Sequence, residues 1–155
     1  MPSIAFQRLI MVIILAACGA ARAASVNDGL VVVNSTRDFA ETIARVEAEI
    51  RARNLTVFAK VAHAEGAESA GLELPPTTTL IFGKPEAGTP LMHCSRTVAI
   101  DLPQKLLIWE DARGRIRLAY NDPHWLGARH RLKGCEKALE NIGAALSAIA
   151  GAAAN

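Results

Sequence analysis

A hairpin in the second half of the chain is the feature that most restricts the fold. Residues 106–109 are apolar, and residues 115–120 alternate apolar with more polar side chains. A short turn ending in Gly114 separates the two segments. Alternation with a period of two is typical of a half-buried strand, and strands joined by so short a turn pair antiparallel. The sequence therefore predicts a sheet that is at least partly antiparallel.

The segment that begins near residue 39 predicts an amphipathic helix. Its apolar residues are Phe39, Ile43, Val46 and Ile50. Their spacings of four, three and four place them on one helical face. Ser35 is the expected N-cap, because its hydroxyl can accept a backbone N–H in the first turn. The helix is expected to end near residues 53–54.

A second helix is expected from about Cys135 to Ala150. Its apolar stripe consists of Leu139, Ile142, Leu146 and Ile149. Cys135 precedes Leu139 by four residues, so it lies on the same inward face. The alanine-rich end of this helix is expected to fray, which leaves residues 151–155 as a tail.

Three further segments predict strands, at residues 30–33, 55–63 and 78–82. Between them, residues 83–90 are interpreted as a turn-rich loop, residues 91–100 as holding a short helix and residues 121–123 as a turn. The expected order is strand, helix, strand, strand, short helix, strand, strand, helix. It predicts a single α+β domain over residues 30–150, with a mostly antiparallel sheet of about five strands and two main helices packed on one face.

The amino-terminal residues predict export. Residues 9–17 form an uninterrupted apolar run, which is shorter than the roughly 20 residues that span a bilayer. Ala21-Arg22-Ala23 has the small-x-small pattern of a signal-peptidase site. Residues 1–23 are therefore expected to be an export signal peptide, followed by a flexible lead at residues 24–29.

A second interpretation of the same region fits equally well. Leu15-Ala16-Ala17-Cys18 resembles a bacterial lipobox, in which residues 1–17 are removed and Cys18 is acylated. Both interpretations make the protein exported, either periplasmic or secreted. They differ in whether a lipid at Cys18 anchors it as a membrane lipoprotein.

Charge excludes one class of partner. The formal net charge is +2, and basic and acidic residues are interspersed along the chain without runs of one sign. A nucleic-acid-binding protein carries a basic stripe or patch, so no nucleic acid is expected as a partner. Contact with a membrane is expected only through a lipid at Cys18.

Several motifs in order resemble those of the Domain of Unknown Function 302 family, from about Val26 to Ala150. They are His63-Ala64, Gly71 to Thr77, Leu80 to Pro85, Gly88 to Met92, Ala99 to Lys105, Ile108 to Asp111, Tyr120 to Pro123 and Arg129-His130. The resemblance implies a compact α/β domain that can occur alone. It implies no established reaction, cofactor or catalytic residue. Cys94 and Cys135 depart from the family pattern.

Cys94 and Cys135 remain as an even pair once Cys18 is removed or acylated. Exported proteins keep disulfides, so we expect these two residues to form a structural bridge. Two buried free thiols are the alternative. The chain has no Cys-x-x-Cys motif that would favour redox chemistry.

The candidate ligand-binding residues are His63, Trp109 and Tyr120. His63 ends a predicted strand, and it is either a polar group in an apolar pocket or an edge histidine with a satisfied ring. Trp109 and Tyr120 are packing residues that could also line a cavity. The remaining histidines lack the short spacing of metal ligands, so no metal or other cofactor is expected.

Two hypotheses follow for function. The first is an exported module without enzymatic activity that binds a small apolar ligand or a protein partner at the less covered face of the sheet. Dimerisation through that face is the alternative to a ligand. The second is a small enzyme or metal-handling protein centred on His63, which requires His63 to lie in a pocket near another titratable group.

Overall fold

The computed structural model describes residues 28–155. The expected signal peptide, the lipobox ending at Cys18 and most of the expected lead lie outside these residues. The elements in chain order are β1 (Leu30–Asn34), α1 (Phe39–Ala52), β2 (Thr56–Ala62), α2 (His63–Ser69), β3 (Thr77–Gly83), α3 (Pro85–Cys94), the 3₁₀ helix η1 (Arg96–Ile100), β4 (Gln104–Glu110), β5 (Ile116–Asn121), α4 (Pro123–His130) and α5 (Glu136–Ala154).

The five strands form one antiparallel sheet in the order β1-β5-β4-β3-β2. The predicted hairpin is confirmed, since Leu107 of β4 pairs with Ala119 of β5 and Ile108 pairs with Leu118. The hairpin explains the strand order at the centre of the sheet, because consecutive strands joined by a tight turn become neighbours. The α+β fold with about five antiparallel strands is therefore as predicted.

Asp111 closes the hairpin. Its carboxylate accepts hydrogen bonds from the guanidinium groups of Arg115 and Arg117 and from the backbone N–H of Arg113. These bonds, above all the one from the Arg115 side chain, hold the pKa of Asp111 well below its usual range. The carboxylate thus has a structural role in the turn between β4 and β5.

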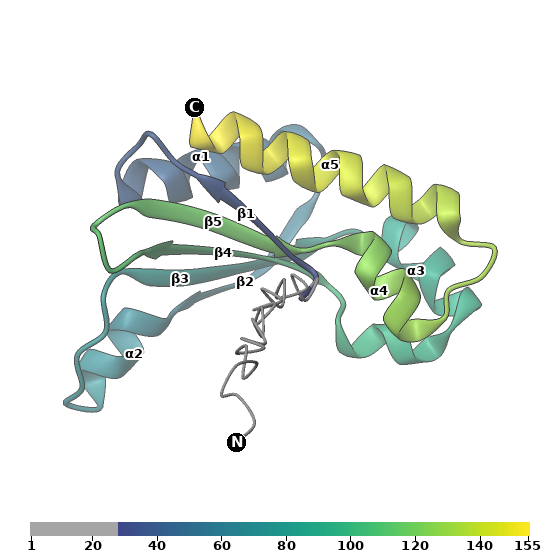
Figure 1. Ribbon diagram of the computed structural model, residues 1–155, viewed down its shortest axis with the longest axis horizontal. Coiled ribbons are helices and arrows are strands. Elements are labelled where there is room, and N and C mark those ends of the chain that lie inside the picture. The colour runs from purple at the N-terminus through teal and green to yellow at the C-terminus, as the bar shows by residue number, and fades with distance from the viewer. Residues whose placement is uncertain (1–27) are drawn as a thin grey trace, which may run out of the picture.

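The two main helices, α1 and α5, lie side by side on one face of the sheet (Figure 1). Their apolar stripes meet the inward side chains of the central strands. Val46 and Ile50 of α1, Ile149 of α5 and Leu118 of β5 are completely buried there. This layer is the hydrophobic core, and it matches the arrangement predicted from the two amphipathic segments.

The opposite face of the sheet is not covered by α1 or α5 (Figure 1). The strand register places a row of small or apolar side chains across its middle, namely Val32, Ala119, Leu107, Thr79 and Val61. Val32 and Val61, at the two edges, are about two-fifths exposed (42% and 39%). The expectation that this face binds a partner or a second copy of the chain stays a prediction.

Helix α3 replaces most of the loop expected at residues 83–90, so that expectation was wrong from Pro85 onward. Pro85 occupies the first turn, where its fixed φ suits a helix and its missing N–H costs nothing. Pro90 lies inside the helix, which continues past it to Cys94. A proline there removes the hydrogen bond to the carbonyl of Glu86.

Helix α4 was also missed, because residues 121–123 were interpreted as a turn. The Asp122 carboxylate accepts the backbone N–H of His124 at 2.9 Å, and Pro123 starts the helix. An aspartate followed by proline is a strong helix start. The sequence therefore contained a helix-start signal, Asp122-Pro123, but these residues were interpreted only as part of a turn.

The ends of the two main helices differ from expectation. Asp38 rather than Ser35 caps α1, accepting the backbone N–H of Glu41 at 2.7 Å. Helix α5 continues to Ala154, which is fully buried, so the expected frayed tail at residues 151–155 was wrong. The backbone and hydroxyl of Thr36 both donate to the Ala154 carbonyl, which fixes this end against the start of α1.

Candidate functional site

A cleft of about 960 Å³ lies on the helical side of the molecule. We call it the α3–α5 cleft. Helices α3 and α5 form its sides, and the ends of β2, β3 and β4 with the adjoining loops close it. Its apolar wall includes Leu55, Phe58, Phe82, Met92, Ile142 and Leu146. Binding sites for small molecules are typically 300–1,000 Å³ and lined mainly by apolar side chains.

The cleft exists because the facing helices carry small residues there. Ala138 and Ala145 of α5 and Ala87 and Gly88 of α3 all line it. Ala138 and Ala145 are seven residues apart, which places them on one face of α5. A side chain of one methyl group or none cannot fill the space between two helices, so the space remains open.

A β-bulge brings Phe58 to the cleft. The register of β2 against β3 shifts between Val57 and Ala59, so Phe58 is the extra residue. Val57 pairs with Phe82, while Ala59 pairs with Ile81 on the uncovered face. A bulge redirects a side chain, and here Phe58 lines the cleft while remaining 55% exposed. Phe58 thus forms an exposed aromatic rim.

The floor of the cleft reaches the core. Phe82, Leu146 and Ile149 line it, yet each is at most 2% exposed to solvent. Their side chains pack with the central layer between the sheet and α5. A molecule in the cleft would therefore rest on the same apolar surface that stabilises the fold.

The polar side chains of the lining come from several elements, and Arg53, Thr89 and Asn141 are among them. Lys84 and Glu86 lie at the start of α3, Gln104 starts β4 and Lys137 lies in the first turn of α5. The Lys137 ammonium pairs with Glu140 at 3.2 Å. The Gln104 Nε2 is buried and has no hydrogen-bond partner among the described residues. It is a donor that the protein itself leaves unsatisfied.

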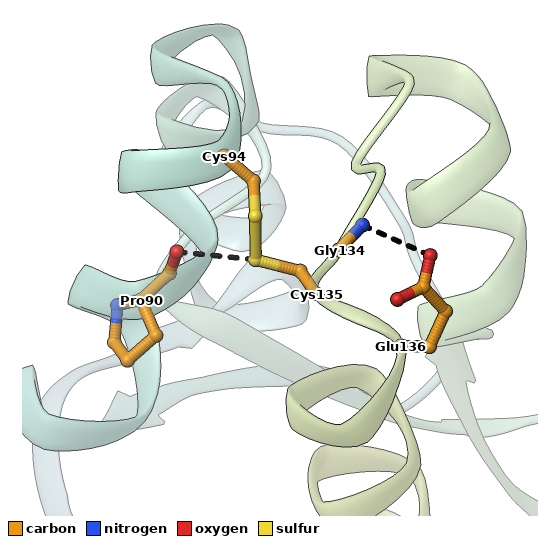
Figure 2. Close-up of a disulfide and its surroundings, with 5 residues drawn as sticks. All are labelled: Pro90, Cys94, Gly134, Cys135 and Glu136. Carbon is orange, nitrogen blue, oxygen red and sulfur yellow. Dashed lines mark hydrogen bonds between the residues drawn. A yellow bond between two sulfur atoms is a disulfide. The ribbon is translucent and has the colours of Figure 1, made fainter.

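The disulfide Cys94–Cys135 joins the two sides of the cleft (Figure 2). Cys94 ends α3 and Cys135 directly precedes α5; their Cα atoms are 6.5 Å apart. The Cys135 sulfur lies 3.2 Å from the Pro90 carbonyl oxygen (Figure 2). The bridge fixes the end of α3 to the start of α5, so it limits how far the cleft can open.

Glu136 holds the turn that precedes α5. Its carboxylate accepts the backbone N–H of Gly134 at 3.0 Å (Figure 2). Backbone hydrogen bonds, first from its own N–H and then from Gly134, lower the pKa of the Glu136 carboxyl. Gly134 has a φ of 82°, a conformation that favours glycine. This local order positions Cys135 for its bond to Cys94.

The three candidate residues from the sequence lie apart, and none of them lines the α3–α5 cleft. His63 is exposed at the start of α2, with its Nε2 3.1 Å from the Thr79 hydroxyl. Trp109 lies on β4 opposite Thr77 and Arg117, on the uncovered face. The structure thus places His63 and Trp109 on the side of the sheet away from α1 and α5.

Tyr120 is buried on the helical side of β5. It lines a smaller cavity of about 320 Å³ together with Asp122, Pro123 and Glu140. Burial raises the pKa of the Tyr120 hydroxyl above its ordinary value. Within residues 28–155, no group of three or more histidine, cysteine or acidic side chains could hold a metal ion.

Sequence reasoning missed a buried polar chain around His130. The His130 Nε2 lies 2.5 Å from the Asp101 carboxylate, and its Nδ1 lies 3.0 Å from the Thr97 hydroxyl. The His130 side chain is only 6% exposed. Neither cavity is lined by these three residues. The chain fastens η1 to α4, and η1 in turn borders the α3–α5 cleft through Ala99.

We expect His130→Ala to lower the free energy of unfolding by about 2 kcal/mol, because it leaves the largely buried Asp101 carboxylate without its imidazole partner. Urea denaturation would measure the change. His124→Ala is the matched control, since His124 is exposed on the same helix. If His130→Ala lowers the free energy of unfolding no more than the control does, the hydrogen bonds of His130 do not stabilise the contact between η1 and α4.

The chain is similar to known proteins both in sequence and in fold. The sequence model described as "Domain of unknown function DUF302" matches residues 31–149. A crystal structure of an uncharacterised conserved DUF302 protein from Bacillus stearothermophilus superposes with a TM-score of 0.74 at 19% identity. The superposition covers 83% of this chain and 99% of that one. It shows that the fold is shared.

The curated relatives that the chain matches are named as fluoride channels. Proteins named Fluoride-specific ion channel FluC 1, from Brucella suis biovar 1 (strain 1330) and Brucella abortus biovar 1 (strain 9-941), are each 48% identical over 110 residues, or 71% of this chain. The matches cover 43% and 41% of those proteins, so more than half of each relative lies outside the matched segment. Within residues 28–155, no helix has both the length and the apolar character needed to cross a membrane.

Proposed function

This chain belongs to the DUF302 family, and we propose that it is a binding module, without a catalytic role, for a small and largely apolar ligand. The α3–α5 cleft carries this proposal. It has the volume of a ligand site, an apolar wall and a floor of core residues. An apolar molecule that leaves water for such a surface gains roughly 25 cal/mol per Å² of apolar area removed from solvent.

Catalysis has less support from the arrangement of side chains. Among residues 28–155, no histidine or cysteine lines the cleft, and the charged residues that line it are Arg53, Lys84, Glu86 and Lys137. The imidazole of His63, on which the enzyme hypothesis rested, is exposed and bonded to a hydroxyl rather than to a titratable group. A general acid or base needs a partner and a pocket, and His63 lines neither of the two cavities described above.

We further propose that the domain acts after export, in the periplasm or outside the cell. The amino-terminal signal pattern and the bridge between Cys94 and Cys135 support this location, because disulfides persist in oxidising compartments. For the relatives named fluoride channels, we propose that the matched segment supplies a ligand-binding domain. The remainder of each chain would then carry the activity in the name.

Binding of decanol tests the proposed function, because decanol is small, mostly apolar and uncharged. We expect saturable binding of one decanol per chain in isothermal titration calorimetry with the oxidised protein. The heat-capacity change on binding should be negative, since apolar surface leaves water. Heats indistinguishable from dilution over the soluble range of decanol, repeated with longer alkanols, would contradict the proposal.

A further inference from the structure

We propose that the natural ligand of the α3–α5 cleft is an amphipathic anion, a carboxylate with an unbranched alkyl chain, whose carboxylate binds where β3 and β4 end. This inference rests on the proposed function, since it names the class of ligand for the same cleft. Three observations carry it: an unsatisfied donor, an unpaired cation and the position of a helix start.

The unsatisfied donor is the amide of Gln104. Gln104 pairs with Phe82 across the sheet, so its side chain is directed to the helical side, where it lines the cleft. Its Nε2 is buried without a partner among the described residues. A buried donor left without an acceptor costs about 1–3 kcal/mol. A ligand oxygen reaching this nitrogen would remove that cost, so the ligand should carry an acceptor at this end.

The unpaired cation is Lys84. It follows Gly83 at the end of β3, two residues beyond the partner of Gln104, which is about 7 Å along a strand. No described carboxylate forms an ion pair with Lys84, whereas Arg53 pairs with Glu49 and Lys137 pairs with Glu140. An ammonium group with no internal partner at the mouth of an apolar cleft favours a ligand of opposite charge.

The start of α3 adds to the same preference. Residues 84–88 all line the cleft, and α3 has ten residues, so its positive end faces this part of the cavity. Glu86 is the single carboxylate among the described residues of the lining, and it opposes an anion there. Glu86 lies in the first turn of α3, whereas Lys84 precedes the helix in an extended conformation as its N-cap residue.

The apolar remainder of the cleft fits an alkyl chain. The residues of α5 that line it run from Lys137 to Ile149, which is about 18 Å along a helix axis. Lys84 and Gln104 beside this apolar length match a molecule with one anionic end and one long apolar tail. A compact polar ligand would leave most of this wall exposed to water.

The test compares three probes that share one alkyl chain: decanoate, decanol and decylammonium. Calorimetry with the oxidised protein at pH 7 should show decanoate binding about tenfold more tightly than decanol, and decylammonium more weakly than decanol. The difference in affinity between decanoate and decanol should become smaller as salt is added, because salt screens partly exposed charges.

Substitutions test whether Lys84 and Gln104 cause the preference for decanoate over decanol. Lys84→Gln and Gln104→Leu should each lower the ratio of decanoate affinity to decanol affinity from about tenfold toward one. Lys133→Gln is the matched control, since Lys133 is exposed and does not line the cleft. Glu86→Gln should tighten the binding of decanoate.

The results of these titrations distinguish failure of the anionic-ligand inference from failure of the proposed binding function. Equal affinity for decanoate and decanol, or tighter binding of decylammonium, would overturn the anionic ligand and leave the apolar cleft standing. Failure of all three probes to bind would overturn the proposed function itself. A preference for decanoate that survives both substitutions would place the carboxylate elsewhere and refute the assignment to Lys84 and Gln104.

Discussion

Replacing Ala145 with phenylalanine should weaken the binding of decanol by more than about tenfold, which corresponds to about 1.4 kcal/mol. Ala145 lies on the wall of the α3–α5 cleft, where its single methyl group leaves the space open. An aromatic ring at this position would occupy the volume that the ligand needs. Calorimetry with decanol measures the loss.

Ala148→Phe is the matched control for this substitution. Ala148 lies on the same helix three residues later, is exposed and does not line the cleft. We expect wild-type affinity in this variant and urea midpoints close to the wild type in both. Unchanged affinity in Ala145→Phe, or an equal loss in Ala148→Phe, would show that decanol binds outside the cleft.

Reduction of the disulfide should lower the free energy of unfolding by about 4 kcal/mol. The bridge joins cysteines that are 41 positions apart in the sequence, and the chain-entropy model gives this value for a loop of that length. Urea denaturation with and without a reducing agent measures the difference. The same treatment should weaken ligand binding, because α3 and α5, the two sides of the cleft, lose their covalent link.

The double variant Cys94→Ala/Cys135→Ala separates loss of the bridge from other effects of the reductant. Its stability should match that of the reduced wild type and should not respond to a reducing agent. Mass analysis under non-reducing conditions should find the wild-type chain two hydrogens lighter than its sequence predicts. Two free thiols in protein purified from an exported source would refute the bridge.

Local sequence patterns were enough to predict most of the secondary structure that builds the core. The hairpin of β4 and β5 and the helices α1 and α5 each bury one regular face, so their spacing identifies them. Helix α3 was missed because residues 83–90 were interpreted as a turn-rich loop, although Pro85 stands in the first turn where a helix accepts it. The end of α5 was missed because its burial depends on Thr36, which is 118 residues away.

The candidate site was far less accessible to sequence reasoning. The α3–α5 cleft is formed by what small residues such as Ala138 and Ala145 leave unfilled, and an alanine in a helix gives no signal of a cavity. The pair of His130 and Asp101 is separated by 29 residues and meets only through the packing of η1 on α4. Sites assembled from several elements need the tertiary structure to be found.

The position of the ligand is the central claim, and methyl NMR during a titration with decanol tests it most directly. We predict that methyl signals of Leu55, Met92 and Leu146, which line the α3–α5 cleft, shift and saturate together. The signals of Val32 and Val61 on the uncovered face of the sheet should stay in place. Shifts confined to Val32 and Val61, or no shifts at saturating decanol, would contradict the account.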